Sequence, residues 1–251
     1  MIKQVLLMLA VLITSVNSLA EAPSTPVKSV VLTTKNVITI KGPISGSTES
    51  SFATALFSTD YDDDEVVVFL DSPGGSIVAG NGIIASMKAS GKKIICVAKF
   101  AASMAFVILQ SCDKRYVLDS SIIMQHVASY GVNGQAPNNV SMVNFLEKMV
   151  ETMDRKQAKR IGLEYDEFKA RTRNDLWLYG VDAVSFGAAD EVVNVTCTSR
   201  LVKKRTSITV SSLFGSREFT FSGCPLVGYP LPGVKKDAES IKAYNILNLA
   251  Q

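Results

Sequence analysis

Three short motifs of this chain contain residue types that could together transfer an acyl group. The segment FAASMA (100–105) places Ser103 between an apolar run typical of a strand and one typical of a helix. A serine there would lie beside backbone N–H groups that find no acceptor within the helix. The only histidine of the chain, His126, ends the apolar segment IIMQH (122–126). Because a serine hydroxyl is an effective nucleophile only when a base takes its proton, these two residues indicate nucleophilic catalysis.

The third motif is DSPGGS (71–76), which follows the continuous apolar run VVVFL (66–70). Glycines after a buried strand let backbone N–H groups point at a common anion. In acyl transfer such donors stabilise the developing oxyanion by about 3–4 kcal/mol each. Each motif also fits a structural role, as a turn, a helix-capping serine or a core histidine. The choice between these interpretations depends on the elements that position the motifs.

Strand-like and helix-like segments alternate along most of the chain. Because this alternation is typical of βαβ units with right-handed crossovers, we expect an α/β fold. His126 would then end a core strand, at the edge of the sheet where ligands gather in such folds. Apolar periodicity predicts strands at 27–33, 36–42, 66–70, 93–98, 115–118, 122–125 and 191–195, and helices at 47–58 (capped by Ser47), 77–88, 103–110, 138–161, 165–171 and 181–186.

Four segments in a fixed order resemble the proteolytic subunit family of the Clp proteases. They are DSPGGSIVAGNGIIASM (71–87), AASMAFVIL (101–109), IIMQH (122–126) and, after a long predicted helix, NDLWLYGVDAVSFGAADEV (174–192). The resemblance spans about residues 66–193. It implies an α/β fold of the ClpP/crotonase-like type, with a superhelical core of repeated β-β-α units and a protruding long helix.

The resemblance also implies a role for each candidate site residue. Ser103 matches the nucleophile of the family, His126 its general base, and Asp175 the acid that orients the histidine. The backbone N–H donors of the oxyanion hole match Gly75 and Met104. The resemblance implies no metal and no cofactor.

The chain departs from the family pattern around the site. Lys99 and Phe100 precede AASM where the family usually has a glycine nearby, and Phe100 could narrow a substrate channel. Val-Ala-Ser follows His126 in place of Gln-Pro. Asp182 and Asp190 are alternatives to Asp175 as the supporting acid.

The N-terminal residues 1–20 have the pattern of a secretory signal peptide. Lys3 precedes the apolar run 5–13, and Ser18-Leu19-Ala20 has the small-x-small pattern of a cleavage site. The run is shorter than the ~20 residues that span a bilayer, although an uncleaved anchor is the alternative. We expect cleavage after Ala20, a periplasmic or secreted protein, and no stable membrane span.

Four cysteines are an even number, as expected of disulfides in an oxidising compartment. Three pairings are open. We favour Cys96 with Cys112, because a helix would fold back along the strand of Cys96, and Cys197 with Cys224, which would close a C-terminal hairpin. Buried free thiols are the alternative. No cysteine spacing suggests zinc.

The sequence pattern changes after Val195, from alternating strand-like and helix-like segments to an alternating, basic segment, and this divides the chain. We expect a ClpP/crotonase-like domain at 21–195 and a C-terminal extension at 196–251. The extension would contain a β-hairpin at 199–221 turning near Gly215, a Pro/Gly loop at 228–234 and a helix at 237–249. A net charge of +3 gives no electrostatic footprint for nucleic acid.

The expected function is that of an exported serine peptidase that hydrolyses peptides or unfolded chains. We expect no ATPase partner, because exported proteins meet no ATP. Helix 138–161 resembles the handle through which the rings of the family stack, which implies a homo-oligomer, and residues 131–139 would align a peptide as an added strand.

Three alternatives stay open. A Ser–Lys dyad, as in signal peptide peptidase A and NfeD-type proteases, would use Lys148 or Lys156. An inactive Clp-fold scaffold would keep the fold without the chemistry. A crotonase-like acyl-CoA enzyme is disfavoured, because export removes the supply of CoA.

Overall fold

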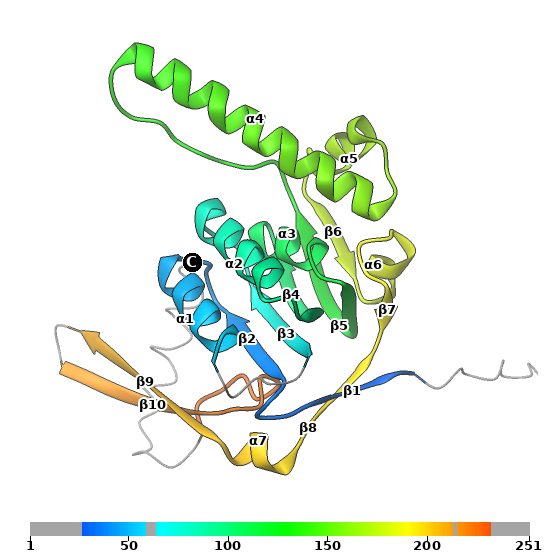
Figure 1. The fold of residues 1–251 in the computed structure, drawn as a ribbon, viewed down its shortest axis with the longest axis vertical. Coiled ribbons are helices and arrows are strands. Elements are labelled where there is room, and N and C mark those ends of the chain that lie inside the picture. Colours follow the sequence, from blue (N-terminus) through cyan, green and yellow to red (C-terminus); the bar gives the residue numbers. More distant parts are fainter. Residues whose placement is uncertain (1–26, 59–63, 213–214, 232–251) are drawn as a thin grey trace, which may run out of the picture.

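One sheet of six strands organises the part of this computed structural model that is described, residues 27–58, 64–212 and 215–231 (Figure 1). The strands follow the order β2-β3-β4-β5-β6, with β7 beside β5. β2 to β5 are parallel neighbours, whereas β6 runs antiparallel to β5. The strands are β2 (Val37–Lys41), β3 (Glu65–Ser72), β4 (Lys93–Ala102), β5 (Lys114–Gln125), β6 (Leu176–Tyr179) and β7 (Glu191–Val192). This mixed architecture with a central sheet agrees with the predicted α/β, ClpP-like fold.

Three helices cover one face of this sheet: α1 (Gly46–Leu56), α2 (Ile77–Ala89) and α3 (Met104–Gln110) (Figure 1). Alternate side chains of the strands point to this face, since the side-chain period of a strand is two. They form one core with the helices, in which Leu70 of β3, Ile83 of α2 and Phe106 of α3 are fully buried. Each such side chain contributes about 1.5–3 kcal/mol through burial.

The other face of the sheet has its own apolar cluster. Phe69 and Val97 of the sheet pack there with Leu32 of β1 (Ser29–Leu32) and Leu201 of α7 (Ser199–Lys203). β1 pairs with β8 (Asn194–Cys197) as a separate parallel ladder. The disulfide Cys197–Cys224, buried at Cys224, ties the segment around Cys224 to this face.

The long helix α4 (Ala136–Ile161) extends beyond the sheet and is followed by α5 (Tyr165–Thr172) (Figure 1). Its last turns are anchored in the core, where Ala158 is buried. Gly162 ends it with a φ of 89°, the left-handed conformation that suits glycine at helix ends. The first half of α4 instead exposes the large apolar side chains Val140, Met142 and Phe145.

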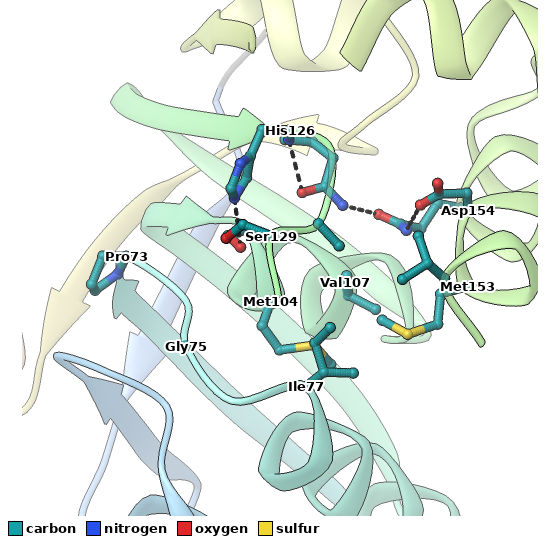
Figure 2. Close-up of a pocket in the computed structure, with 14 residues that line it drawn as sticks. Pro73, Gly75, Ile77, Met104, Val107, His126, Ser129, Met153 and Asp154 are labelled. Atoms are coloured by element: carbon teal, nitrogen blue, oxygen red, sulfur yellow. Dashed lines mark hydrogen bonds between the residues drawn. The ribbon is translucent and has the colours of Figure 1, made fainter. Parts of the chain in front are cut away.

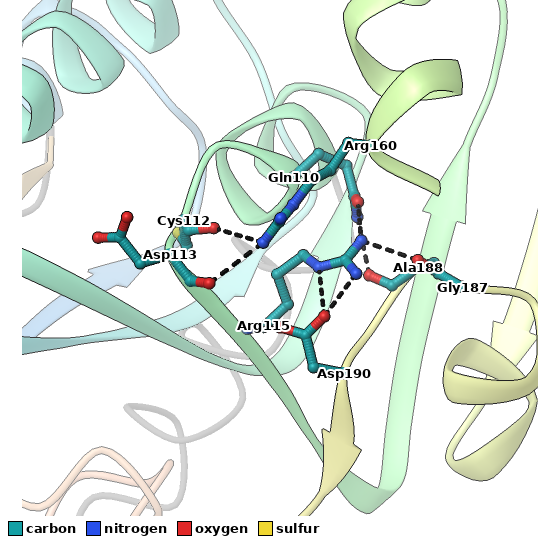
Figure 3. A network of polar contacts seen from close by, with 8 residues as sticks. All are labelled: Gln110, Cys112, Asp113, Arg115, Arg160, Gly187, Ala188 and Asp190. Carbon is teal, nitrogen blue, oxygen red and sulfur yellow. Dashed lines mark hydrogen bonds and ion pairs between the residues drawn. The ribbon is translucent and has the colours of Figure 1, made fainter. Parts of the chain in front are cut away.

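A buried arginine, Arg115 of β5, connects this strand to the end of α3 and to the segment that precedes β7 (Figure 3). Arg115 donates to Asp190 Oδ1 from Nε (3.1 Å) and Nη2 (2.5 Å). Its Nη1 donates to Gln110 Oε1 at 2.7 Å and to the Gly187 carbonyl at 2.8 Å. Burial alone would raise the pKa of Asp190, but the hydrogen bonds and charge of Arg115 outweigh it and lower that pKa below its ordinary value.

Most predicted segments form the expected element, and the exceptions have local causes. Ser45 caps α1 in place of Ser47, because Ser45 and Thr48 exchange a reciprocal capping box. The two strands predicted at 115–118 and 122–125 are one strand, β5, in which residues 118–121 bulge opposite Lys99 of β4. Strand β6 was not predicted, because its side chains alternate between half-buried and exposed.

The C-terminal extension contains a hairpin, as predicted, but a shorter one. β9 (Arg205–Ser212) pairs antiparallel with β10 (Gly215–Ser222), and the residues from 199 to 203 form helix α7 instead. Both favoured disulfides, Cys96–Cys112 and Cys197–Cys224, are present, which confirms that pairing. The predicted signal peptide (1–20) and terminal helix (237–249) lie outside the described residues. Within the described ranges, no helix has the length and apolarity that a membrane crossing requires.

Candidate active site

Ser103 lies at the junction between β4 and α3 in an unusual backbone conformation. Its φ of 54° and ψ of −121° fall in a region that non-glycine residues rarely adopt, and surrounding bonds must hold it there. The Ser103 N–H donates to the Met124 carbonyl of β5 at 3.0 Å, and its carbonyl accepts from Phe106 N–H at 3.0 Å. Although Ser103 occupies the N-cap position of α3, its hydroxyl makes no capping bond. The structure therefore does not support a purely capping role.

His126 follows the last residue of β5 and contacts this hydroxyl directly. Its Nε2 lies 2.9 Å from Ser103 Oγ, a hydrogen-bond distance (Figure 2). The parallel pairing of β4 with β5, which sets Ala102 beside Met124, aligns the two strand ends. When Nδ1 carries the ring proton, Nε2 is the acceptor and can take the hydroxyl proton. This geometry fits a nucleophile with its general base.

Asp175 immediately precedes β6, whose pairing with β5 brings it near the histidine. The last residue pair of this antiparallel ladder is Gln125 with Leu176, so His126 and Asp175 are the next residues on either strand. The Asp175 side chain is exposed, and among the described residues no hydrogen bond joins it to His126. Of the alternative acids, Asp190 is engaged by Arg115, and Asp182 lies in α6 (Val181–Ser185).

Gly74 and Gly75 bring the loop after β3 against Ser103. A Cβ on Gly74 would lie 2.7 Å from Ser103 Cβ and 2.8 Å from Met104 N, so only glycine allows this approach. Gly75 has a φ of 141°, and a Cβ there would collide with the Ile44 carbonyl oxygen. Both positions need glycine, and Gly75 lines the cavity at Ser103 together with Met104.

Ile44 holds this loop in place through its backbone. Its N–H donates to the Gly74 carbonyl at 2.7 Å, and its carbonyl accepts from Ser76 N–H at 2.9 Å. Among the hydrogen bonds of the described residues, the N–H groups of Gly75 and Met104 have no acceptor. Backbone N–H groups without an acceptor beside a nucleophile are the kind of donor that an oxyanion hole uses.

A cavity of about 220 Å³ opens beside Ser103 and His126 (Figure 2). Gly75, Met104, Ser103 and His126 all line it, whereas Asp175 does not. The expectation that Phe100 could narrow the substrate channel receives no support at this cavity, because Phe100 is not among its lining residues. Apolar walls come from Ile77, Val107, Val150 and Met153.

The far end of the cavity is polar and was not anticipated from the sequence. Asp154 of α4 lines it with Gln125 and Gln157, which are both buried. Burial raises the pKa of the Asp154 carboxyl to about 6, against the opposing effects of Lys169 and of a hydrogen bond from Gln157. A sequence pattern could have indicated this polar end. Asp154 and Gln157 lie on the same predicted helix face as Val150 and Met153, so they place polar side chains on an otherwise apolar stripe.

The model of the Clp protease family matches residues 24–196 of the chain. The chain belongs to the Clp protease family. Clp proteolytic subunit 2 of Pseudomonas aeruginosa, described as ATP-dependent, is 29% identical over 134 residues, which cover 52% of this chain and 67% of that protein. The ATP-dependent Clp proteolytic subunit 3 of Rhodococcus jostii is 33% identical over 133 residues, covering 52% and 66%. The chain thus spans about two thirds of the length of either relative.

Membership in the Clp family gives this chain its chemical class. Clp family proteins are serine peptidases, hydrolases that act on peptides, and they assemble into homo-oligomeric rings. The apposition of Ser103 and His126 is the arrangement that such chemistry needs. Within the described residues no cluster of three or more histidine, cysteine or acidic side chains could hold a metal ion.

Proposed function

We propose that this Clp family protein is an exported serine peptidase that cleaves peptides or already unfolded chains without an ATPase. Ser103 is the nucleophile, His126 the general base and Asp175 the acid that orients it. The observation that carries the proposal is the 2.9 Å contact between His126 Nε2 and Ser103 Oγ. A serine with a histidine at hydrogen-bond distance can be deprotonated as it attacks.

The reaction proceeds in two halves through an acyl-enzyme. Ser103 Oγ attacks the carbonyl carbon of the scissile amide while His126 Nε2 takes the hydroxyl proton. The N–H groups of Gly75 and Met104 bind the oxyanion that forms. His126 then donates its proton to the departing amine as the C–N bond breaks. In the second half, His126 takes a proton from a water molecule as that water attacks the ester carbonyl carbon. His126 then returns the proton to Ser103 Oγ as the ester C–O bond breaks and the carboxylic acid product leaves.

Asp175 is the acid of choice because of its position in the sheet. It directly precedes β6, and the β5–β6 ladder ends at Gln125 and Leu176, the residues next to His126 and Asp175. This neighbourhood supports Asp175 as the carboxylate that would orient the imidazole. Asp190 is a poor candidate, because Arg115 holds its carboxylate 2.5 Å away in the network of Figure 3. Asp182 lies in α6, on no strand that adjoins His126.

The Ser–Lys alternative has less support. Lys148 and Lys156 are both exposed on α4, and neither lines the cavity that contains Ser103. A general base must come within hydrogen-bond reach of the proton it removes, which His126 does and these lysines do not.

Export is part of the proposal and has two kinds of support. The first 20 residues have the pattern of a cleavable signal peptide. The disulfides Cys96–Cys112 and Cys197–Cys224 are typical of an oxidising compartment. Because such compartments lack ATP, we infer that the substrates arrive unfolded.

Terminal sequencing of the protein from the periplasm of a bacterial host should find Glu21 as the first residue; a retained Met1 would contradict export by cleavage.

The proposal also includes assembly into a ring of identical subunits. The first half of α4 exposes Val140, Met142 and Phe145, which a neighbouring subunit could bury. Exposed apolar side chains grouped on one element are typical of an interaction surface.

A fluorophosphonate probe tests the catalytic assignment directly. The mature protein should be labelled on Ser103, and Ser103→Ala and His126→Ala should both abolish labelling. Lys148→Ala and Lys156→Ala are matched controls that should keep it. Loss of labelling in a lysine variant but not in His126→Ala would establish the dyad instead. If the wild-type protein is not labelled and turns over no peptide, the inactive scaffold is the correct function.

A further inference from the structure

We propose that the cavity beside Ser103 and His126 selects a lysine or arginine side chain on the substrate residue that supplies the scissile carbonyl, and that Asp154 recognises its positive charge. This inference rests on the proposed peptidase function and specifies its substrate preference. It makes Asp154 a specificity-determining residue, distinct from the residues that carry out the chemistry.

The cavity has the size and walls for one long side chain. Its volume of about 220 Å³ is below the roughly 300 Å³ at which pockets begin to hold drug-sized ligands. Val107, Val150 and Met153 line its length, and such apolar walls suit the methylene groups of lysine or arginine. Ser103 and His126 line the same cavity, so a side chain inside it would place its own carbonyl at the nucleophile.

The Asp154 carboxylate is available to a ligand. Its Oδ1 accepts a hydrogen bond from Gln157 Nε2 at 3.2 Å. Among the described residues no lysine, arginine or histidine nitrogen lies within 4.0 Å of it. Arg155, the next residue on α4, pairs with Glu151 and stacks on Tyr165. The carboxylate therefore lacks a neutralising partner, which a substrate cation could supply.

A chain of buried amides fixes this carboxylate relative to the catalytic strand (Figure 2). Gln157 Oε1 accepts from Gln125 Nε2 at 2.5 Å, and Gln125 Oε1 accepts from the His126 backbone N–H at 3.1 Å. Gln125 and Gln157 are only 4% and 2% exposed, so burial restricts them to these partners. These hydrogen bonds thus connect Asp154 to His126, which lies at the opposite end of the same cavity.

The ionisation of Asp154 should be linked to the binding of a cation. Burial raises the pKa of Asp154 to about 6, whereas the positive charge of Lys169 on α5 lowers it. His126, at the end of β5, is a second titratable group that lines the same cavity. A positive substrate group favours the charged carboxylate, which is the form that binds it. Below pH 6 the neutral acid would accept uncharged side chains instead, so the preference for lysine should rise between about pH 5 and 7.

Matched peptide substrates test the inference. Fluorogenic coumarin amides that differ only in lysine or norleucine before the scissile bond share the stem and differ in the charge. At pH 8 the ratio of kcat/KM for lysine over norleucine should be about tenfold or more, as for a charge-assisted contact. Asp154→Asn should reduce this ratio at least tenfold, and Asp154→Glu should retain it.

Glu151→Gln removes the same charge one turn away on α4 and should leave the ratio unchanged. Groups such as His126 act on both substrates, so the pH dependence that their ionisation gives to kcat/KM cancels in the ratio.

A binding measurement separates this inference from the proposed function. The Ser103→Ala protein, titrated by NMR with the two peptides as uncleavable carboxamides, should bind the lysine peptide about tenfold more tightly. Adding Asp154→Asn should remove the difference. If the wild-type protein cleaves neither substrate but this difference is found, the peptidase proposal fails and the specificity of the cavity stands. Equal affinity for the two peptides, or a ratio that Asp154→Asn does not change, would overturn the inference.

Discussion

His126 and Asp175 flank the last residue pair of the β5–β6 ladder, Gln125 with Leu176, so each adjoins the end of its strand. The two are 49 residues apart in sequence (175 − 126). An edge strand of four residues therefore delivers the acid of the proposed triad. Asp175 itself has a φ of 53°, which turns the chain sharply as it enters β6.

Replacing Asp175 by asparagine should slow catalysis without unfolding the protein. In the proposed mechanism the carboxylate favours the histidine tautomer that accepts the serine proton, so its loss should lower kcat about 10³–10⁴-fold. The measurement is kcat on a fluorogenic peptide, with Asp182→Asn as the matched control that keeps activity. An unchanged kcat in Asp175→Asn would remove Asp175 from the site.

Gly74→Ala should abolish activity through a backbone collision. The added Cβ would lie 2.6 Å from the Ala102 carbonyl oxygen and 2.7 Å from Ser103 Cβ, so the loop or the serine must move. The φ of 95° at this position adds strain for any residue with a side chain. Fluorophosphonate labelling of Ser103 should be lost, whereas Gly46→Ala, where no atom lies within 4 Å, should label normally.

Asp190→Asn should destabilise the protein in a pH-dependent way. Arg115 would lose its ion-pair partner while it is 7% exposed, which should cost about 2 kcal/mol at pH 7, between the values for exposed and buried pairs. Because the folded protein lowers the pKa of Asp190, the stabilisation is present above the unfolded pKa of about 3.9 and is lost as the pH falls below it. Urea unfolding should therefore show a difference from wild type at pH 7 that shrinks towards pH 3. A constant difference would mean that Asp190 does not act through its charge.

The disulfide Cys197–Cys224 should stabilise the fold without serving the chemistry. It closes a loop of 27 residues, for which the loss of unfolded-state entropy predicts about 3–4 kcal/mol. The double variant Cys197→Ser/Cys224→Ser should lose about that much free energy of unfolding. It should still label at Ser103, because Cys224 packs in the cluster on the opposite face of the sheet from α3. Loss of labelling in a folded double variant would assign the extension a direct role at the site.

Phe145→Glu should reduce the size of the assembly. Phe145 is 61% exposed on α4, and a charge there would be buried at the proposed contact between subunits. Light scattering should find a ring for the wild-type protein and a smaller species for the variant. Lys159→Glu, on an exposed position near the other end of the helix, should assemble normally. A wild-type monomer would exclude this use of α4.

The sequence by itself determined the elements whose signals are local. A continuous apolar run identified β3, which is buried on both faces, and apolar side chains at helical spacing identified α2 and α4. The same signals put Ser103 at a strand-to-helix junction and His126 at the end of a strand. The two disulfides were predictable because each joins cysteines that are nearest neighbours in sequence, 16 and 27 residues apart.

Only the tertiary structure decided which distant residues meet. Arg115 and Asp190 are 75 residues apart, and no local pattern specifies their pairing. Strand β6 exists because β5 offers it a free edge, since its own side chains form no buried run. Asp154 continues the helical stripe of Val150 and Met153, but only the packing of α4 shows that this stripe lines the cavity of Ser103. Periodicity fixes which face of an element is buried, but the contacts across faces depend on how the elements pack together.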